Sequence, residues 1–156
     1  MTPFFEDLLD RFHELHADIG KALDELPQAA LDWKPGEDMN SLCVLVVHAT
    51  GAERFLIGDV VMGDPSNRNR EIEFQATGLD VNTLKSRLID ADAYARTAFE
   101  TLNLQDLEML RRSPRDGHKL TVAWALTHAL EHTAIHLGHI QMISQLWMQK
   151  YSKEHP

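Results

Sequence analysis

The chain has 156 residues, about the length of one compact domain, and we expect a single domain over residues 1–156. Apolar residues make up 44% of the chain and charged residues 25%, which is typical of a globular protein and excludes a disordered one. The formal charge of −9 argues against nucleic acid as a partner, because an acidic surface repels phosphate backbones.

The start of the chain, "MTPFFEDLLDRFHEL", places acids inside its apolar stretch, unlike a secretory leader. Because no run approaches the roughly 20 apolar residues of a membrane span, we expect no membrane partner and a cytoplasmic location. Cys43 is the single cysteine, so it cannot form an internal disulfide. Any bound metal would therefore depend on nitrogen and oxygen ligands.

The first predicted helix begins with Thr2 as cap and Pro3 in the first turn, and Pro27 ends it. Its apolar residues recur at helical spacing: Phe4, Leu8, Phe12, Leu15, Ile19, Leu23 and Leu26. The segment 28–40, "QAALDWKPGEDMN", reads as a connection in which Trp33 packs against the helices.

A second helix is predicted to begin near Ser41 and to cover Leu42 to Met62. Its first half is apolar almost all round, which favours burial on more than one side. The stretch 63–70, "GDPSNRNR", breaks this helix, and residues 71–74 are predicted to form a short extended segment.

A third helix is predicted over Val81 to Leu102, with Asp80 or Asn82 as its cap. After a loop over residues 103–120, Thr121 can cap a last helix that extends to about Tyr151. The third helix carries one apolar stripe, formed by Leu84, Leu88, Ala91, Ala95, Ala98 and Leu102. Four long helices favour an all-α fold, the four-helix bundle.

The last helix carries "HALEHTAIHLGHI", with His128, His132, His136 and His139. At about 100° per residue these histidines lie within an arc of about 80°. The same face holds Trp124, Ile135, Met142 and Leu146. We therefore expect the histidines to point toward the core, where each imidazole needs a polar partner.

Helical rise limits which histidines can share a metal. His128 and His136 stand about 12 Å apart along the axis, too far for one ion. Either His128 with His132 or His132 with His136 can bind together, as in helices that hold zinc through two histidines four residues apart. His48, in "VLVVHATGAERF", is the other histidine in an apolar helical stretch and supplies a third ligand. Three histidines with one open position are typical of a catalytic zinc site, although nickel, iron(II) and copper(II) also accept imidazole.

The remaining titratable side chains have simpler interpretations. Cys43 is expected to be an inert core thiol, and Glu53 and Glu131 to point away from the ligands and pair at the surface or at an interface. His16 borders an apolar face and is expected to be half-exposed. Solvent exposure is expected for His118 and His155.

Three segments, "LDWKPGEDMNSL", "LVVHATGAERFLIG" and "THALEHTAIHLGHIQ", resemble the DinB-like superfamily of four-helix proteins with a metal site. The family pattern has one histidine on the second helix and two histidines four residues apart on the last, often followed by Arg-Gly-Gln. His48 matches the first histidine, and His132 and His136 match the pair. His139 stands where the family usually has glutamine.

The resemblance implies His48, His132 and His136 as metal ligands, with zinc or nickel as the first candidates. It also implies a small-molecule substrate and a homodimer. Some relatives are transferases or isomerases that use a low-molecular-weight thiol such as bacillithiol or mycothiol, and others are described as metal-dependent hydrolases. His128 and His139 are weak catalytic candidates that would transfer protons, orient a ligand or fill the groove.

The sequence also permits three different functions for the histidines. The first is a non-catalytic metal-binding or stress-associated module. The second is a haem protein that holds the haem between His48 and His132. In the third, the histidines are hydrogen-bonded core residues of an interaction protein.

Overall fold

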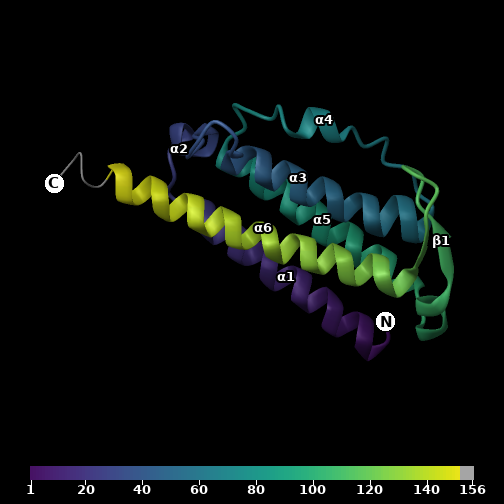
Figure 1. Ribbon diagram of the computed structural model, residues 1–156. Coiled ribbons are helices and arrows are strands. Elements are labelled where there is room, and N and C mark those ends of the chain that lie inside the picture. The colour runs from purple at the N-terminus through teal and green to yellow at the C-terminus, as the bar shows by residue number, and fades with distance from the viewer. Residues whose placement is uncertain (152–156) are drawn as a thin grey trace.

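The computed structural model describes residues 1–151. Four long helical segments lie alongside one another (Figure 1), which confirms the predicted all-α four-helix bundle. They are α1 (Pro3–Leu23), α3 (Leu42–Arg54) continued by the π-helical segment η1 (Phe55–Met62), α5 (Val81–Thr101) and α6 (Val122–Tyr151). Short elements connect them: the helices α2 (Gln28–Asp32) and α4 (Arg70–Glu73), the 3-10 turn η2 (Leu104–Glu108) and the strands β1 (Leu110–Arg112) and β2 (Lys119–Thr121).

Side-chain caps begin three of the long helices where the sequence predicts them. Ser41 Oγ accepts a hydrogen bond from the Val44 amide at 3.2 Å, and Thr121 Oγ1 accepts one from Trp124 at 3.1 Å. For α5 the cap is Asp80, whose carboxylate accepts from the Thr83 amide at 2.7 Å. Each cap satisfies one of the amides that the first helical turn leaves without a partner.

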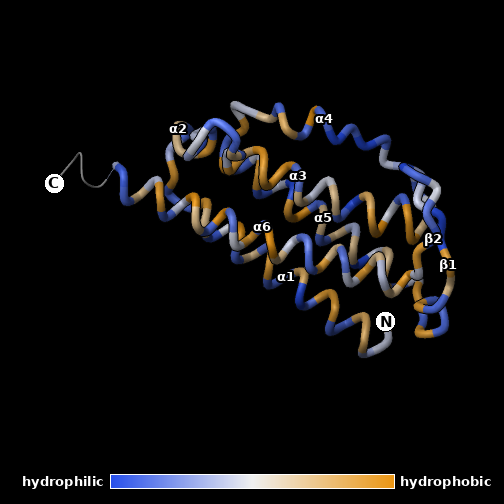
Figure 2. Tube along the Cα trace, viewed as in Figure 1, coloured by the Kyte–Doolittle hydropathy of each residue, from blue (hydrophilic) through white to orange (hydrophobic). Residues whose placement is uncertain are grey.

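The core lies between the four long helices, and orange and blue segments alternate along them (Figure 2) as expected for amphipathic helices. The predicted apolar stripe of α5 is buried throughout. In α1, Phe4 is 41% exposed and Phe5 is buried in its place. Within residues 1–151, no helix is both long enough and apolar enough to cross a membrane.

Two connections differ from the sequence prediction. Residues 71–74 were expected to be extended, but α4 occupies this place because the Asn69 side chain accepts a hydrogen bond from the Ile72 amide and caps a helical turn. The predicted loop 103–120 contains η2 and a short antiparallel hairpin, in which Leu110 pairs with Thr121 and Arg112 with Lys119. The hairpin lies at the end of the bundle where α6 begins (Figure 1).

The orientation of α6 corrects a further expectation. The face that carries the histidines does not point into the core: Trp124 is 47% exposed, Ile135 52% and Met142 61%, and His139 is exposed as well. The buried face is rotated by about 90° from it and consists of Val122, Ala125, Leu126, Ala129, Thr133, Leu137, Ile140, Ile143, Ser144 and Trp147. Since α6 contacts both α1 and α3, its inward direction falls between these two helices.

A candidate metal centre between two helices

The structure brings His48, His132 and His136 together. His48 projects from α3, while His132 and His136 stand one turn apart on α6. The ring centroid of His48 lies 5.1 Å from that of each of the other two, and those two lie 4.4 Å apart. One ring nitrogen from each residue lies within 4.8 Å of the others. The described chain holds no other such group of three or more.

The spacing of these nitrogens fits a single divalent cation. The Nε2 atoms of His132 and His136 are 3.3 Å apart. Two ligands at Zn–N distances of 2.0–2.1 Å around a tetrahedral ion stand roughly 3.3–3.4 Å apart. Three histidines fill three of the four positions of such an ion, so one position stays open for a substrate or water.

The surroundings keep the paired imidazoles neutral. Burial, with a smaller contribution from the nearby His136, His48 and His128, lowers the pKa of His132 to about 3. Burial and the neighbouring His48 and His139 lower the pKa of His136 to about 4. Both side chains are therefore unprotonated near neutral pH, the state in which an imidazole nitrogen binds metal.

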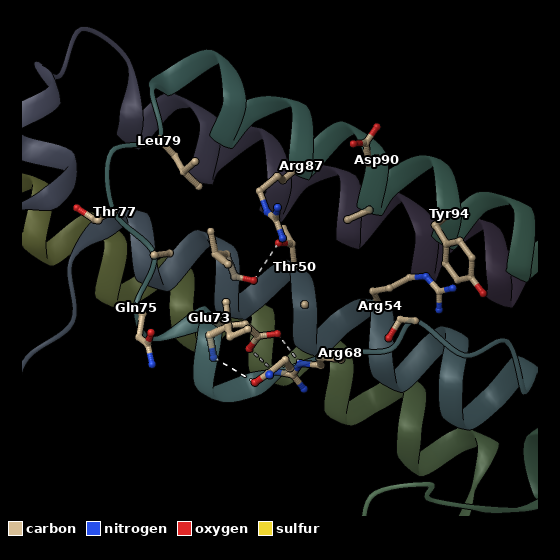
Figure 3. Close-up of a pocket in the computed structure, with 17 residues that line it drawn as sticks. Thr50, Arg54, Arg68, Glu73, Gln75, Thr77, Leu79, Arg87, Asp90 and Tyr94 are labelled. Atoms are coloured by element: carbon tan, nitrogen blue, oxygen red, sulfur yellow. Dashed lines mark hydrogen bonds and ion pairs between the residues drawn. The ribbon is translucent and has the colours of Figure 1, made fainter.

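A carboxylate orients the third imidazole. His48 Nδ1 lies 2.9 Å from Glu73 Oε2. Arg68 holds the same carboxylate with contacts of 2.6 Å from Nε and 2.7 Å from a terminal nitrogen (Figure 3). Burial alone raises the pKa of Glu73, but Arg68 and His48 bring it below its usual value. An ionised Glu73 accepts a hydrogen bond from Nδ1–H of His48, and this tautomer leaves His48 Nε2 free for a metal.

Gly51 makes this contact sterically possible. A Cβ atom at position 51 would overlap Oε1 of Glu73, so the absence of a side chain allows the carboxylate to approach α3. Sequence reasoning missed both Arg68 and Glu73, because they lie in a connection with no helical pattern. The one local signal was the charge of this segment, "NRNREIE", which by itself does not indicate its partner.

The two weak catalytic candidates flank the cluster of three histidines. The His139 ring lies 5.5 Å from that of His136, on the exposed side. The His128 ring stacks on Trp124 at 4.7 Å and lies 6.1 Å from His132. The Nδ1 atom of His128 is 3.3 Å from a carboxylate oxygen of Glu131. Because Glu131 is exposed, this contact agrees with the surface pairing predicted for it.

Two cavities lie near the histidine cluster. One of about 330 Å³ is lined by His48 and His132 themselves, together with residues of η1, the hairpin and the start of α6. A larger cavity of about 870 Å³ lies between α3, α4 and α5, and Arg68 and Glu73 are among the residues that line it (Figure 3). None of the three histidines lines the larger cavity, so the smaller one is the better candidate for substrate binding.

Two side chains are buried where the sequence predicted exposure. His16 is 5% exposed and Glu53 only 2%, and His16 Nε2 lies 2.9 Å from Glu53 Oε2. Thr133 of α6 also donates to Glu53, at 3.3 Å. The predictions failed because both residues face neighbouring helices, which their own helical pattern does not reveal.

The remaining predictions concern single residues. Cys43 is buried as expected, and burial raises the pKa of its thiol, which favours the inert form. Burial of Trp33 is partial, and its ring packs on Trp147 with a centroid distance of 5.6 Å. His118 is exposed as predicted, whereas His155 lies outside the described residues.

The fold and the histidine cluster together define a class of protein. It is a four-helix bundle in which three histidines meet between two of the helices. The family model of the DinB superfamily matches residues 11–140. The chain therefore belongs to the DinB superfamily, as the sequence motifs predicted. No curated protein matches the sequence closely enough to count as a relative.

Solved structures share the fold at low sequence identity. A conserved protein from Enterococcus faecalis is 12% identical with a TM-score of 0.79, covering 94% of this chain and 98% of its own. A DinB-like protein from Bacillus subtilis is 20% identical with a TM-score of 0.68, covering 90% and 91%. A mycothiol-dependent maleylpyruvate isomerase is 16% identical with a TM-score of 0.64, covering 88% of this chain and 62% of its own.

Proposed function

We propose that this protein is a metal-dependent enzyme in which His48, His132 and His136 hold one divalent cation, zinc or nickel. Its reaction is the transfer of a low-molecular-weight thiol to a small substrate, or a hydrolysis. The observation that carries the proposal is the convergence of the three imidazoles, with two Nε2 atoms 3.3 Å apart. When bound, the cation would lower the pKa of a thiol or water at its open position.

The protein's own residues support this chemistry in separate ways. Glu73 fixes the ring of His48 through Nδ1, and burial keeps His132 and His136 unprotonated. The cavity of about 330 Å³ gives a small molecule access to His48 and His132. His128 and His139 would transfer protons if the reacting atom comes within about 3 Å of either.

Thiol transfer is the leading reaction class, and one comparison supports it. The mycothiol-dependent isomerase has the same fold over 88% of this chain. Thiol dependence is known for that protein, and we extend it to this chain as a proposal. Hydrolysis remains the second candidate, because a three-histidine cation with an open position activates water equally well.

Elemental analysis of untagged protein, purified without chelators, tests the metal site. We expect about one divalent ion per chain in the wild type and loss of that ion in His132→Ala. His13→Ala is the matched control, since His13 is an exposed histidine on α1, outside the histidine cluster. A wild-type protein that stays metal-free after exposure to zinc, nickel and iron(II) would refute the proposal.

Assays of the metal-loaded protein then separate the two reactions. A thiol transferase consumes an electrophilic substrate only when a low-molecular-weight thiol is present, and the thiol appears in the product. A hydrolase turns over without thiol. If neither activity appears but metal binding strongly raises the midpoint temperature of unfolding, the results favour a non-catalytic metal-binding module.

Haem binding fits the geometry poorly. The rings of His48, His132 and His136 are in mutual contact, so a porphyrin plane does not fit between His48 and His132.

A further inference from the structure

The cavity of about 330 Å³ beside the histidine cluster is built from segments far apart in the sequence. His48 of α3 and His132 of α6 form one side of it. Other parts of its lining come from the start of α4 and the residues before it, with Arg70 and Arg68, and from the β1–β2 hairpin, with Arg115. A small molecule in this cavity would therefore touch the metal ligands and the hairpin together.

The charge of the cavity is opposite to that of the whole chain. Its lining contains three arginines, Arg68, Arg70 and Arg115, and one acid, Asp116, whereas the chain as a whole carries a formal charge of −9. Cationic side chains are thus concentrated in the lining of this cavity. Such a pocket attracts anions and raises their local concentration.

Two of these guanidinium groups are available to a ligand. Arg68 already makes two contacts with Glu73. The guanidinium of Arg70 lies over the Phe74 ring at 4.8 Å and pairs with no carboxylate among residues 1–151. The contact of Arg115 with Asp116 is long, 3.4 Å, and exposed on both sides, so it contributes little and is easily exchanged.

The rest of the lining is suited to an organic molecule. Phe55 and Trp124 contribute aromatic surface, and the His128 ring extends it by stacking on Trp124 at 4.7 Å with an angle of 30° between the planes. Leu56 and Leu120 add apolar contacts. The lining of the cavity thus combines arginine side chains with aromatic and apolar ones, next to His48 and His132.

We propose that the substrate or thiol used at this site is a small molecule with an oxyanion head group, a carboxylate or a phosphate, held by Arg70 and Arg115. This inference rests on the proposed function, because it assigns the molecule to the same site. Guanidinium groups bind both kinds of oxyanion with paired, charge-assisted hydrogen bonds. The organic part of the molecule then lies against Trp124 and His128.

Calorimetric titration tests the inference on metal-free and zinc-loaded protein. The probes are succinate, inorganic phosphate and the neutral analogue succinamide. We expect the anions to bind and succinamide not to bind. The tighter of succinate and phosphate identifies the head group.

Variants then assign the anion to the two arginines. Arg70→Gln and Arg115→Gln should each weaken anion binding by about tenfold, and Asp116→Asn should strengthen it. Arg96→Gln is the matched control and should bind like the wild type, because Arg96 is an exposed arginine of α5 outside the cavity. Thermal melts of each variant check that the fold is intact.

The results separate a failure of this inference from a failure of the proposed function. If neither anion binds, if succinamide binds as well as succinate, or if both arginine variants bind like the wild type, the inference is refuted. Binding that needs zinc but ignores the arginines shows the anion on the metal itself, which refutes the inference and retains the metal site. If the protein takes up no metal but binds the anion through the arginines, the result supports the anion pocket and refutes the proposed metal-dependent function.

Discussion

At the scale of single residues, the three-histidine cluster is distinguished by polar groups that contact it from a connecting segment. Glu73 is almost completely buried, yet it stays ionised because Arg68 offers two donors and His48 a third. The carboxylate would therefore fix both the tautomer and the direction of the His48 ring. Gly51 provides the space that this arrangement requires.

Replacing Glu73 with Gln tests this role. The variant keeps the size of the side chain but removes the charge, and the amide can present a donor to Nδ1 in place of an acceptor. We expect metal affinity to fall by about 10- to 100-fold, measured by competition with a chromophoric chelator. Glu71→Gln, an exposed change in the same helix α4, should leave the affinity unchanged, and equal affinities for both variants would contradict the orienting role.

The buried pair of His16 and Glu53 gives the protein a stability that depends on pH. Burial alone lowers the pKa of His16, but the hydrogen bond and charge of Glu53, together with Asp92, raise it above its usual 6.5. A histidine whose pKa is raised on folding stabilises the fold fully below pH 6.5 and loses that contribution as pH rises through the folded-state pKa.

Urea unfolding of the wild type and of His16→Gln at several pH values measures this contribution. The difference in unfolding free energy should be largest near about pH 6 and shrink by about pH 9. The variant should be less stable at low pH because it leaves Glu53 buried opposite a neutral amide, and breaking a buried pair costs about 3–5 kcal/mol. A difference that stays constant over this range would show that His16 is not charged in the folded protein.

At the scale of the elements, the bundle depends on caps that stop and start its helices at defined residues. Helix α5 offers a clean comparison because Asp80 and Asn82 both stand at its beginning. The structure selects Asp80, whose carboxylate accepts from the Thr83 amide at 2.7 Å. Asn82 is an exposed residue of the first turn.

Removing the cap should therefore lower stability, and removing its neighbour should not. Asp80→Ala is expected to reduce the unfolding free energy by about 1 kcal/mol, measured by urea denaturation. Asn82→Ala should lie within about 0.5 kcal/mol of the wild type, since surface changes away from such features have small effects. The reverse order would show that the helix begins at a different residue.

At the scale of the whole molecule, α6 exposes apolar side chains that another protein surface could cover. Ile135, Met142 and Leu146 recur on one face, although a surface helix normally presents polar residues there. We propose that a second copy of the chain covers this face, which gives the homodimer that the family resemblance implies. The histidine cluster would then lie next to the interface.

Light scattering coupled to size-exclusion chromatography tests the dimer. The wild type should elute with twice the mass of one chain, and Ile135→Lys should shift it toward the monomer because it places a charge in the apolar contact. Ile89→Lys is the matched control, since Ile89 is an exposed isoleucine on α5. A wild-type monomer, or a dimer that both variants retain, would contradict an interface on α6.

The sequence alone determined what depends on neighbours along the chain. Helical spacing, the caps Ser41 and Thr121, and the four-residue interval between His132 and His136 are local features, and they predicted the four helices and a pair of histidines on the last one. The cap of α5 was left open between Asp80 and Asn82, and the structure decided it. Family resemblance added the choice of His136 over His128. These features need no knowledge of the tertiary packing, because a helix brings residues i and i+4 onto one face by itself.

Only the tertiary structure decided the features that involve distant segments. The packing of α6 on both α1 and α3 turned its histidine face outward by about 90°, against the expectation from its own apolar pattern. The return of the 63–74 segment over α3 brought Arg68 and Glu73 to His48, and the meeting of α1 with α3 buried His16 against Glu53. Such pairs are separated by tens of residues, and the charge of one partner in the sequence does not indicate which side chain across the bundle will compensate it.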